Sequence, residues 1–232
     1  MNTPAVSIII PVLNEADGIV HVLERLQGFR AQGTEVIVVD GGSDDDTAEC
    51  ARSLADCVTT SRRGRALQMN AGAALASGDI LLFLHADTLL PSAALELVRA
   101  AVSNRGCWGR FDVSIDGGIR GLGMVAFMMN WRSRLTGIAT GDQGIFVKRE
   151  AFQHSGGFPA IPLMEDIVFS HVMRKEGWPV CLTERVTTSG RRWEKHGLLS
   201  TILTMWWLRL RFFFGASPNA LAREYGYLPD GT

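Results

Sequence analysis

Three strongly apolar runs alternate with helical patterns in the first hundred residues, and this alternation restricts the possible folds more than any other feature. The runs at 5–12 (AVSIIIPV), 34–39 (TEVIVV) and 79–84 (DILLFL) have the length and composition of strands buried on both faces. Helical patterns over 65–76 and 91–103 lie before and after the third run. The repeat predicts an α/β fold with a mostly parallel central sheet and helices on both faces.

The turns after the first two runs carry side chains that can start a helix. Asn14 can cap the helix after the first run, and Ser43 can cap a helix that begins with Asp44, Asp45 and Asp46. Such side chains accept hydrogen bonds from free backbone N–H groups, and acidic residues in a first turn suit the helix dipole. We therefore expect helices to begin directly after these two caps.

The second half of the chain has a less regular pattern. We expect a strand near 107–115, an apolar helix over 119–135, a strand over 142–148, and helices over 165–176 and 196–214. No linker, repeat or low-complexity stretch interrupts the pattern, so a single domain is expected.

Charge is balanced over the whole chain but unevenly distributed along it. The chain has 23 Lys+Arg and 24 Asp+Glu, a net charge of −1, so it has no general attraction for nucleic acid. Residues 185–232 nevertheless carry seven Lys/Arg and three Asp/Glu. A hydrophobic content of 47% is typical of a folded chain. The composition therefore predicts an acidic folded body followed by a basic, aromatic-rich tail.

Cysteine usage and the apolar stretches indicate a cytoplasmic protein without a membrane-spanning helix. The four cysteines have no CxxC or Cys/His spacing, so no structural zinc site is expected and reduced thiols are favoured. The apolar stretches at 121–131 and 198–208 are shorter than the roughly 20 residues that span a bilayer. The N-terminus has no basic region of the kind that begins a signal peptide.

Polar side chains gather where the three predicted strands end. Ligands of open α/β sheets bind beyond the carboxyl ends of the strands, and three acidic groups are expected to converge there. A carboxylate directly after DILLFL could hold a hard cation, which in turn could neutralise a diphosphate. The residues are Pro11, Asn14 and Glu15 after the first run, Asp40 and Gly41 after the second, and His85, Ala86 and Asp87 after the third.

Two common nucleotide-binding motifs are absent from the sequence. The turn VLNEADG after the first strand contains no G-x-G-x-x-G, and the chain contains no G-x-x-x-x-G-K-[ST]. A dinucleotide-binding fold and a P-loop NTPase are therefore disfavoured.

Taken together, the motifs resemble those of family 2 glycosyltransferases with the GT-A fold. They occur in the family's order and run to about residue 177. LHADT, the ED pair and SGRRWEKHG at 189–197 are most similar to a small bacterial subgroup of single-domain enzymes. The other resembling segments are SIIIPVLNEADGI at 7–19, EVIVVDGGSDDDTAE at 35–49, GRALQMNAGAALASGDILLFLHADT at 64–88, GDQGIFVKREAF at 141–152 and MEDIVFSHVMRKEG at 164–177.

The resemblance implies one GT-A-like glycosyltransferase domain over 1–232. Within it, 1–104 would bind the nucleotide sugar and 105–190 would supply the acceptor side and the catalytic group. Residues 191–232 would form an aromatic, basic, helical C-terminal segment.

The resemblance also implies a nucleotide diphosphate sugar as donor, with a UDP-sugar favoured. Asp40 would bind the base, and Pro11 and Glu15 would line the base and ribose pocket. Asp87 would be the second acid of a DxD-like motif and would bind Mg²⁺ or Mn²⁺ between the two phosphates. His85 stands where the first Asp of that motif usually lies, so the sequence departs from the family pattern there.

Asp166 of the Glu165–Asp166 pair would be the catalytic base of an inverting transfer, because the acceptor hydroxyl must lose its proton as it attacks. Glu165 would hold the acceptor or raise the pKa of Asp166 by like-charge repulsion. His196 is similar in placement to a C-terminal His that completes the metal site in many GT-A enzymes. The remaining assignments are Arg65 toward the nucleotide, and Asp142, Gln143, Arg191, Arg192 and Trp193 toward the acceptor and the diphosphate.

Two other functions stay open at this point. The chain could be a non-catalytic nucleotide-sugar-binding protein, since His85 replaces an expected acid, or it could be a sugar nucleotidyltransferase. Structural roles also remain possible for single residues: Arg65 could belong to a solvated basic turn, and Glu165–Asp166 could be an acidic helix start.

The C-terminal tail has two interpretations. It could be a helix that packs on the body with its Arg side chains at the edge. It could instead contact a membrane surface, a lipid-linked acceptor or a second copy of the chain. The aromatic residues around Arg209 and Arg211 are Trp206, Trp207, Phe212, Phe213 and Phe214.

Overall fold

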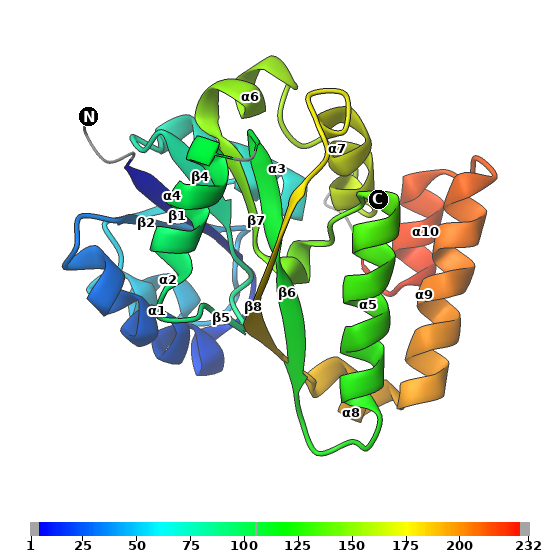
Figure 1. Ribbon diagram of the computed structural model, residues 1–232. Helices are drawn as coiled ribbons and strands as arrows, with labels where there is room; N and C mark the ends of the chain where they lie inside the picture. The colour runs from blue at the N-terminus through cyan, green and yellow to red at the C-terminus, as the bar shows by residue number, and fades with distance from the viewer. Residues whose placement is uncertain (1–4, 105, 228–232) are drawn as a thin grey trace.

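The computed structural model describes residues 5–104 and 106–227. These residues form one eight-stranded sheet in the order β3-β2-β1-β4-β7-β6-β8-β5 (Figure 1). The strands are β1 (Val6–Val12), β2 (Glu35–Asp40), β3 (Cys57–Thr60), β4 (Ile80–Phe83), β5 (Thr88–Leu89), β6 (Trp108–Asp116), β7 (Ile145–Lys148) and β8 (Val180–Ser189).

The sheet is parallel in its first half and mixed in its second. Strands β1 to β4 pair in parallel, as the apolar runs predict. Strand β7 is antiparallel to both β4 and β6, β6 and β8 are parallel, and β5 is antiparallel to β8. The carboxyl ends of β1, β2 and β4 therefore share one edge of the sheet, where the sequence predicts a ligand site.

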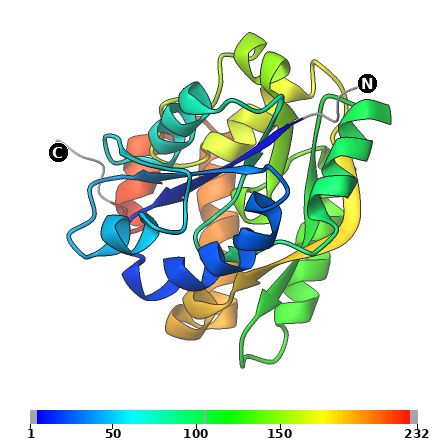
Figure 2. The same cartoon turned by 90° about the vertical axis from the view of Figure 1, so that its left-hand side faces the viewer.

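Helices cover both faces of the sheet. In the view of Figure 2, α1 lies in front of the sheet while α9 and α10 lie behind it. The helices are α1 (Ala16–Arg30), α2 (Thr47–Ala51), α3 (Arg65–Leu75), α4 (Ala94–Asn104), α5 (Leu122–Thr136), α6 (Arg149–His154), α7 (Glu165–Met173), α8 (Arg191–His196), α9 (Leu198–Phe213) and α10 (Pro218–Glu224), with a 3₁₀ turn, η1 (Gly141–Gln143), before β7.

Side-chain alternation along β1 explains why both faces are covered. Ile8 and Ile10 belong to one buried cluster, whereas Ile9 belongs to another on the opposite face, because successive strand residues point to opposite sides. Leu23 of α1 packs in the first cluster, and Phe169 of α7 packs in the second. Each face of the strand thus has its own core.

The predicted helix start at Ser43 is wrong, because α2 begins only at Thr47. The polar residues before it contact the start of α1 instead. Asn14 Oδ1 accepts a hydrogen bond from Asp44 N at 2.8 Å, and Asp45 Oδ2 accepts one from Ala16 N at 3.2 Å. These long-range bonds hold 43–46 as a loop against the first turn of α1.

Several elements are absent from the sequence prediction. The strand β8 and the short helices α6, α8 and α10 were not expected, whereas the expected tail helix at 196–214 is confirmed as α9, which begins two residues later and ends one residue earlier. Gly197 separates α8 from α9, and its φ of 80° lies in the left-handed region, which glycine adopts without steric cost. None of the described helices is long and apolar enough to cross a membrane.

Candidate active site

The turn after β2 holds Asp40 in a buried, fixed position. Asp40 is 3% exposed, and its Oδ1 accepts hydrogen bonds from Ser43 N at 2.7 Å and from Ser43 Oγ at 2.9 Å. Gln68 Nε2 donates to Val12 O at 2.8 Å and to Val39 O at 2.9 Å. Gln68 thereby joins the ends of β1 and β2 and fixes the distance between the two turns.

Gly41 leaves room for the side chain of Gln68. A Cβ at Gly41 would lie 3.0 Å from the side chain of Gln68, which is closer than most real contacts. The glycine therefore lets α3 approach the turn that carries Asp40.

Asn14 does not cap α1 in the way that the sequence predicts. Glu15 occupies the cap position and makes no capping bond through its side chain. Asn14 has a φ of 53°, and its backbone N–H donates to Ser43 Oγ at 2.9 Å. It therefore fastens the β1 turn to the β2 turn, so its placement near the site is structural.

Glu15 and Asp87 both face Arg191 of α8. Arg191 Nη2 lies 2.9 Å from Glu15 Oε2, and the hydrogen bond to Glu15, followed by the charges of Glu15 and Asp87, raises the pKa of Arg191. Asp87 Oδ1 also accepts long hydrogen bonds from the hydroxyls of Thr88 at 3.3 Å and Thr188 at 3.4 Å. Residues far apart in sequence thus meet at the end of β4, as the resemblance implies.

Glu165 and Asp166 lie at the start of α7, next to α3. Glu165 is 2% exposed, and its Oε1 lies 3.3 Å from Arg65 Nη1. Asp166 Oδ2 accepts a hydrogen bond from Gly141 N at 3.1 Å, and its Oδ1 accepts one from Ile167 N at 2.8 Å. Arg65 therefore connects the donor-side helix to the carboxylate pair.

The loop at Gly141 packs directly against His85. A Cβ at Gly141 would lie 2.4 Å from His85 Nε2, so only glycine fits at this position. Because Gly141 N also binds Asp166, the end of β4 and the start of α7 contact the same residue. The predicted donor and catalytic residues therefore belong to one continuous site.

Burial controls the ionisation of His85 and Asp142. Burial, and then the charge of Arg65, lower the pKa of His85 to about 3, so the imidazole is neutral at physiological pH. Burial raises the pKa of Asp142, and the charge of Asp166 adds to the increase. Among the described residues, neither His85 Nε2 nor Asp142 Oδ1 has a hydrogen-bond partner, so both atoms are candidates for contact with a ligand.

Gln143 is not placed to touch an acceptor, so that prediction is corrected. Its side chain is fully buried; Oε1 accepts from Thr140 N at 3.1 Å, and Nε2 donates to Asn130 Oδ1 at 3.3 Å. Asn130 in turn exchanges hydrogen bonds with the backbone of Val113 on β6. Gln143 therefore positions η1, which carries Asp142.

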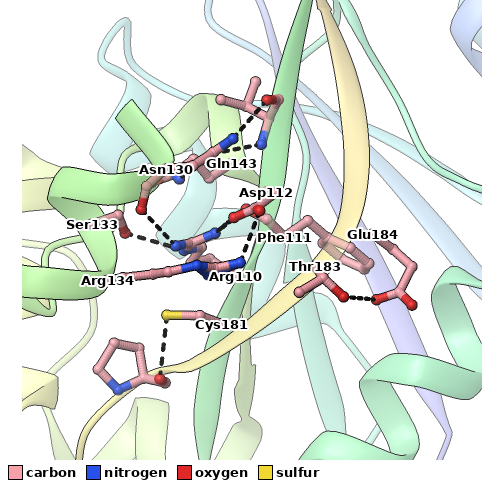
Figure 3. Close-up of polar contacts among 12 residues, drawn as sticks. Arg110, Phe111, Asp112, Asn130, Ser133, Arg134, Gln143, Cys181, Thr183 and Glu184 are labelled. Carbon is pink, nitrogen blue, oxygen red and sulfur yellow. Dashed lines mark hydrogen bonds and ion pairs between the residues drawn. The ribbon is translucent and has the colours of Figure 1, made fainter. Parts of the chain in front are cut away.

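A buried ion-pair network supports the same loop (Figure 3). Arg110 is fully buried and binds Asp112, while its Nε donates to Ser133 Oγ at 3.1 Å. Arg134 Nη2 also lies 2.8 Å from Asp112 Oδ2. The network fastens α5 to β6, and no local sequence pattern predicts it.

The second part of the predicted acceptor side lies on α8 and contacts α10. The guanidinium of Arg192 stacks 3.8 Å above the ring of Tyr225. Arg192, His196 and Tyr225 line a cavity of about 210 Å³ between α8, α9 and α10. Trp193 on the same helix is half-buried.

Tyr225 contacts the predicted acceptor side, and the sequence analysis did not single it out. Burial raises the pKa of Tyr225. The charges of Arg192 and Arg65 lower it, and the charge of Asp142 raises it. The C-terminal segment therefore reaches the charged centre. Only an aromatic residue after a short helical pattern marked it in the sequence.

The residues present fit a cation that arrives with a diphosphate. Among the described residues, no three His, Cys, Asp or Glu side chains are grouped to hold a metal ion. Asp87, half-buried at the end of β4, is a single carboxylate, and Mg²⁺ usually binds through one or two carboxylates together with substrate phosphates and water. His196 lies at the α8–α10 cavity, and its place in a metal site stays a prediction.

We expect a pH-dependent stability that depends on Glu165. Burial, and then the charge of Asp166, raise its pKa from 4.5 to about 7, against the attraction of Arg65. The folded protein therefore binds this proton more tightly than the unfolded chain, and the stability that the proton contributes is lost as the pH rises from about 4.5 to 7. Relative to Glu165→Gln, the free energy of unfolding of the wild type should fall by up to about 3 kcal/mol over this pH range.

Urea unfolding at several pH values measures this difference. Glu150→Gln, an exposed change on α6, is the matched control and should parallel the wild type. A constant difference between wild type and Glu165→Gln at all pH values would contradict the buried, proton-binding carboxylate.

Comparison with known proteins shows the family of the chain. The family model described as glycosyl transferase family 2 matches residues 7–154. An uncharacterized glycosyltransferase of Mycobacterium tuberculosis is 38% identical over 89 residues, covering 36% of this chain and 34% of that protein. Glycosyltransferase AglE of Haloferax volcanii is 38% identical over 93 residues, covering 36% and 31%. The matched part thus spans about a third of the length of these curated relatives.

Solved structures share the fold over a longer part of the chain. A mannosyltransferase of Pyrobaculum calidifontis in complex with GDP-Man and Mn²⁺ has a TM-score of 0.61 and 24% identity, covering 81% of this chain and 57% of that one. TarS of S. aureus, residues 1–349 in complex with UDP, has a TM-score of 0.64 and 19% identity, covering 80% and 60%. These likenesses confirm the expected GT-A fold.

Proposed function

The chain belongs to glycosyl transferase family 2, and from this premise we propose that it moves a sugar from a nucleotide diphosphate sugar to an acceptor hydroxyl. One observation carries the proposal: Gly141 contacts His85 at the end of β4 and binds Asp166 at the start of α7. A donor bound at the carboxyl edge of the sheet would therefore have its reacting carbon near a carboxylate that can take a proton.

The donor would lie across the ends of β1, β2 and β4. Ser43 binds Oδ1 of Asp40, and Oδ2 would bind the nucleotide base. Pro11 and Glu15 would line the pocket for the base and ribose. A UDP-sugar is the favoured donor. Similar structures hold UDP in TarS and GDP-Man in the mannosyltransferase, so both bases belong in a donor screen.

Departure of the nucleotide diphosphate leaves extra negative charge that must be stabilised. Asp87 would hold Mg²⁺ or Mn²⁺, which would neutralise the two phosphates when bound. Arg191 is 57% exposed in its side chain and is paired with Glu15, so it can turn toward a diphosphate. Preorganised cations of this kind stabilise developing charge strongly.

Asp166 would act as the base of an inverting transfer. It is half-buried and fixed by two backbone N–H groups, so its carboxylate is oriented before the acceptor arrives. The acceptor hydroxyl would give its proton to Asp166 while its oxygen attacks C1 from the face opposite to the leaving group. Glu165, held by Arg65, would orient the acceptor side or tune Asp166.

A thermal-shift screen of nucleotide sugars with and without Mn²⁺ tests the donor proposal. A ligand that binds the folded state raises the melting temperature, so one base and one sugar should give a Mn²⁺-dependent increase. No shift with any UDP- or GDP-sugar would contradict the donor site. Nucleotide binding without nucleotide release would favour the non-catalytic alternative, and pyrophosphate release would favour sugar nucleotidyl transfer.

We also propose that the protein works in the cytoplasm at a membrane surface, through α5 and α9. Among the described residues, twelve of the fourteen exposed large hydrophobic side chains lie on these helices or at Phe214 directly after α9. Arg is the only charged residue type on either helix. Exposed aromatic and aliphatic side chains beside Arg are typical of helices that lie on anionic membranes, whereas a two-fold dimer would bring the two basic faces together.

Flotation with anionic vesicles and light scattering test this surface together. We expect the wild type to float and Phe213→Ser, at an 82% exposed position, to float less. Leu75→Ser, 52% exposed on α3, is the control. A monomer that ignores the vesicles contradicts the proposal, and a dimer that does not float would indicate a second copy instead.

A further inference from the structure

A second cavity, of about 510 Å³, lies between α5, α7 and α9. Its size is within the range of small-molecule sites, and it is separate from the residues assigned above to the donor. Its surface combines aliphatic and aromatic side chains with two arginines. The residues that carry the argument are Ile138, Ile167, Phe212, Phe213, Arg132 and Arg209.

The charges in this cavity fit an anion. None of the described residues that line it is acidic. Arg132 Nη2 is buried and has no hydrogen-bond partner among the described residues. Burial, and then the charge of Arg209, lower the pKa of Arg132 to about 10, so Arg132 remains a cation at neutral pH. A buried cation with a free donor is stabilised by an anionic partner.

The cavity is adjacent to the proposed base. Ile167, which lines it, directly follows Asp166 on α7, and the charges of Asp142 and Asp166 act on Arg132. A ligand that binds the arginines would therefore place its polar end beside the Asp166 carboxylate. This is the position that an acceptor must occupy.

The apolar side of the cavity continues onto the exposed face of the two helices. Phe213 both lines the cavity and is 82% exposed, and Leu210 and Leu135 are 50% and 64% exposed. Helices α5 and α9 begin next to each other, since a Cβ on Gly121 would lie 2.9 Å from Leu198, and both line this cavity. An apolar chain leaving the cavity would therefore remain in contact with apolar surface.

We propose that this cavity binds the acceptor and that the acceptor is an amphiphile, with an anionic group between Arg132 and Arg209 and an apolar chain along Phe212, Phe213 and the α5–α9 face. The role of this ligand as an acceptor rests on the proposed glycosyl transfer. The binding of an anionic amphiphile is measured without a donor and stands or falls separately.

Calorimetric titration with dodecyl phosphate, below its critical micelle concentration, tests the site. Dodecyl maltoside has the same chain without the anion, and inorganic phosphate has the anion without the chain. We expect one dodecyl phosphate per protein, bound at least tenfold more tightly than either control ligand. Arg209→Gln and Arg132→Gln should each weaken it at least tenfold, while Arg120→Gln, an exposed change before α5, should not.

Three results would overturn the proposal: equal binding of dodecyl phosphate and dodecyl maltoside, equal binding of inorganic phosphate and dodecyl phosphate, or equal weakening by Arg209→Gln and Arg120→Gln. Arg209 is only half-buried, so its variant keeps the test valid where Arg132→Gln does not fold. The nucleotide thermal shift is recorded on the same samples. Amphiphile binding without nucleotide binding would contradict the glycosyl transfer and leave this site standing, and the reverse would contradict only this site.

Discussion

Asp166→Asn is expected to reduce nucleotide release from the donor by roughly 10²- to 10⁴-fold, the range for loss of a general base. The amide cannot take the proton of the attacking hydroxyl or water. The fold should survive, because the remaining amide oxygen can still accept a hydrogen bond from Gly141 N or Ile167 N. Steady-state nucleotide release measures the loss, and the thermal shift with donor and Mn²⁺ shows that donor binding is kept.

Asp79→Asn is the matched control for this variant. Asp79 precedes β4 at the opposite edge of the sheet, and its side chain is 65% exposed. Its variant should release nucleotide at the wild-type rate. Equal rates for Asp166→Asn and the wild type would contradict the assignment of the base, whatever the donor proves to be.

Asp87→Asn is expected to lower kcat/KM by at least about 100-fold, since a bound cation contributes several kcal/mol to stabilising charge in the transition state. The amide is a weaker ligand for Mg²⁺ or Mn²⁺ than the carboxylate. The amide oxygen can still accept hydrogen bonds from the hydroxyls of Thr88 and Thr188, so the loop should keep its shape. When activity is titrated with Mn²⁺, the variant should need a much higher Mn²⁺ concentration for half-maximal activity than the wild type.

The same control, Asp79→Asn, should keep the wild-type Mn²⁺ dependence. A variant Asp87→Asn with unchanged metal dependence would show that the cation is held elsewhere. His196→Ala then separates the two candidate ligands, because it should change the Mn²⁺ dependence only if that side chain takes part in the metal site.

The parallel half of the sheet could be predicted from sequence because its signal is local. β1, β2 and β4 each form from one strongly apolar run and lie within one or two residues of the predicted bounds. Parallel strands that are covered on both faces have apolar residues at nearly every position, so they can be recognised as continuous apolar runs. The strand ends then place Asp40 and Asp87 on the same edge without any further information.

The second half could not be predicted as well, because it depends on long-range pairing. In β8, exposed and buried residues mix in the segment VCLTERVTTS, and its position beside β6 depends on a register with a bulge between Arg110 and Asp112. Local periodicity contains neither fact. The burial of Gln143 likewise depends on Asn130, thirteen residues away.

The candidate site shows the same division. Asp40, Asp87, Glu165 and Asp166 follow from motifs that resemble the family, and the structure places the last two in contact with Arg65 and Gly141. Tyr225 and the arginine-lined cavity arise where α5, α7, α9 and α10 meet. Tertiary packing creates such sites, so no motif marks them.

Release of nucleotide diphosphate by the purified wild-type protein is the direct test of the proposed glycosyl transfer. The assay presents a panel of UDP- and GDP-sugars with Mn²⁺, and it includes Asp166→Asn and Asp79→Asn beside the wild type. We expect one donor to release its nucleotide diphosphate in a Mn²⁺-dependent reaction that Asp79→Asn retains and Asp166→Asn loses. Release of pyrophosphate, or equal release by wild type and Asp166→Asn, would contradict the proposed transfer.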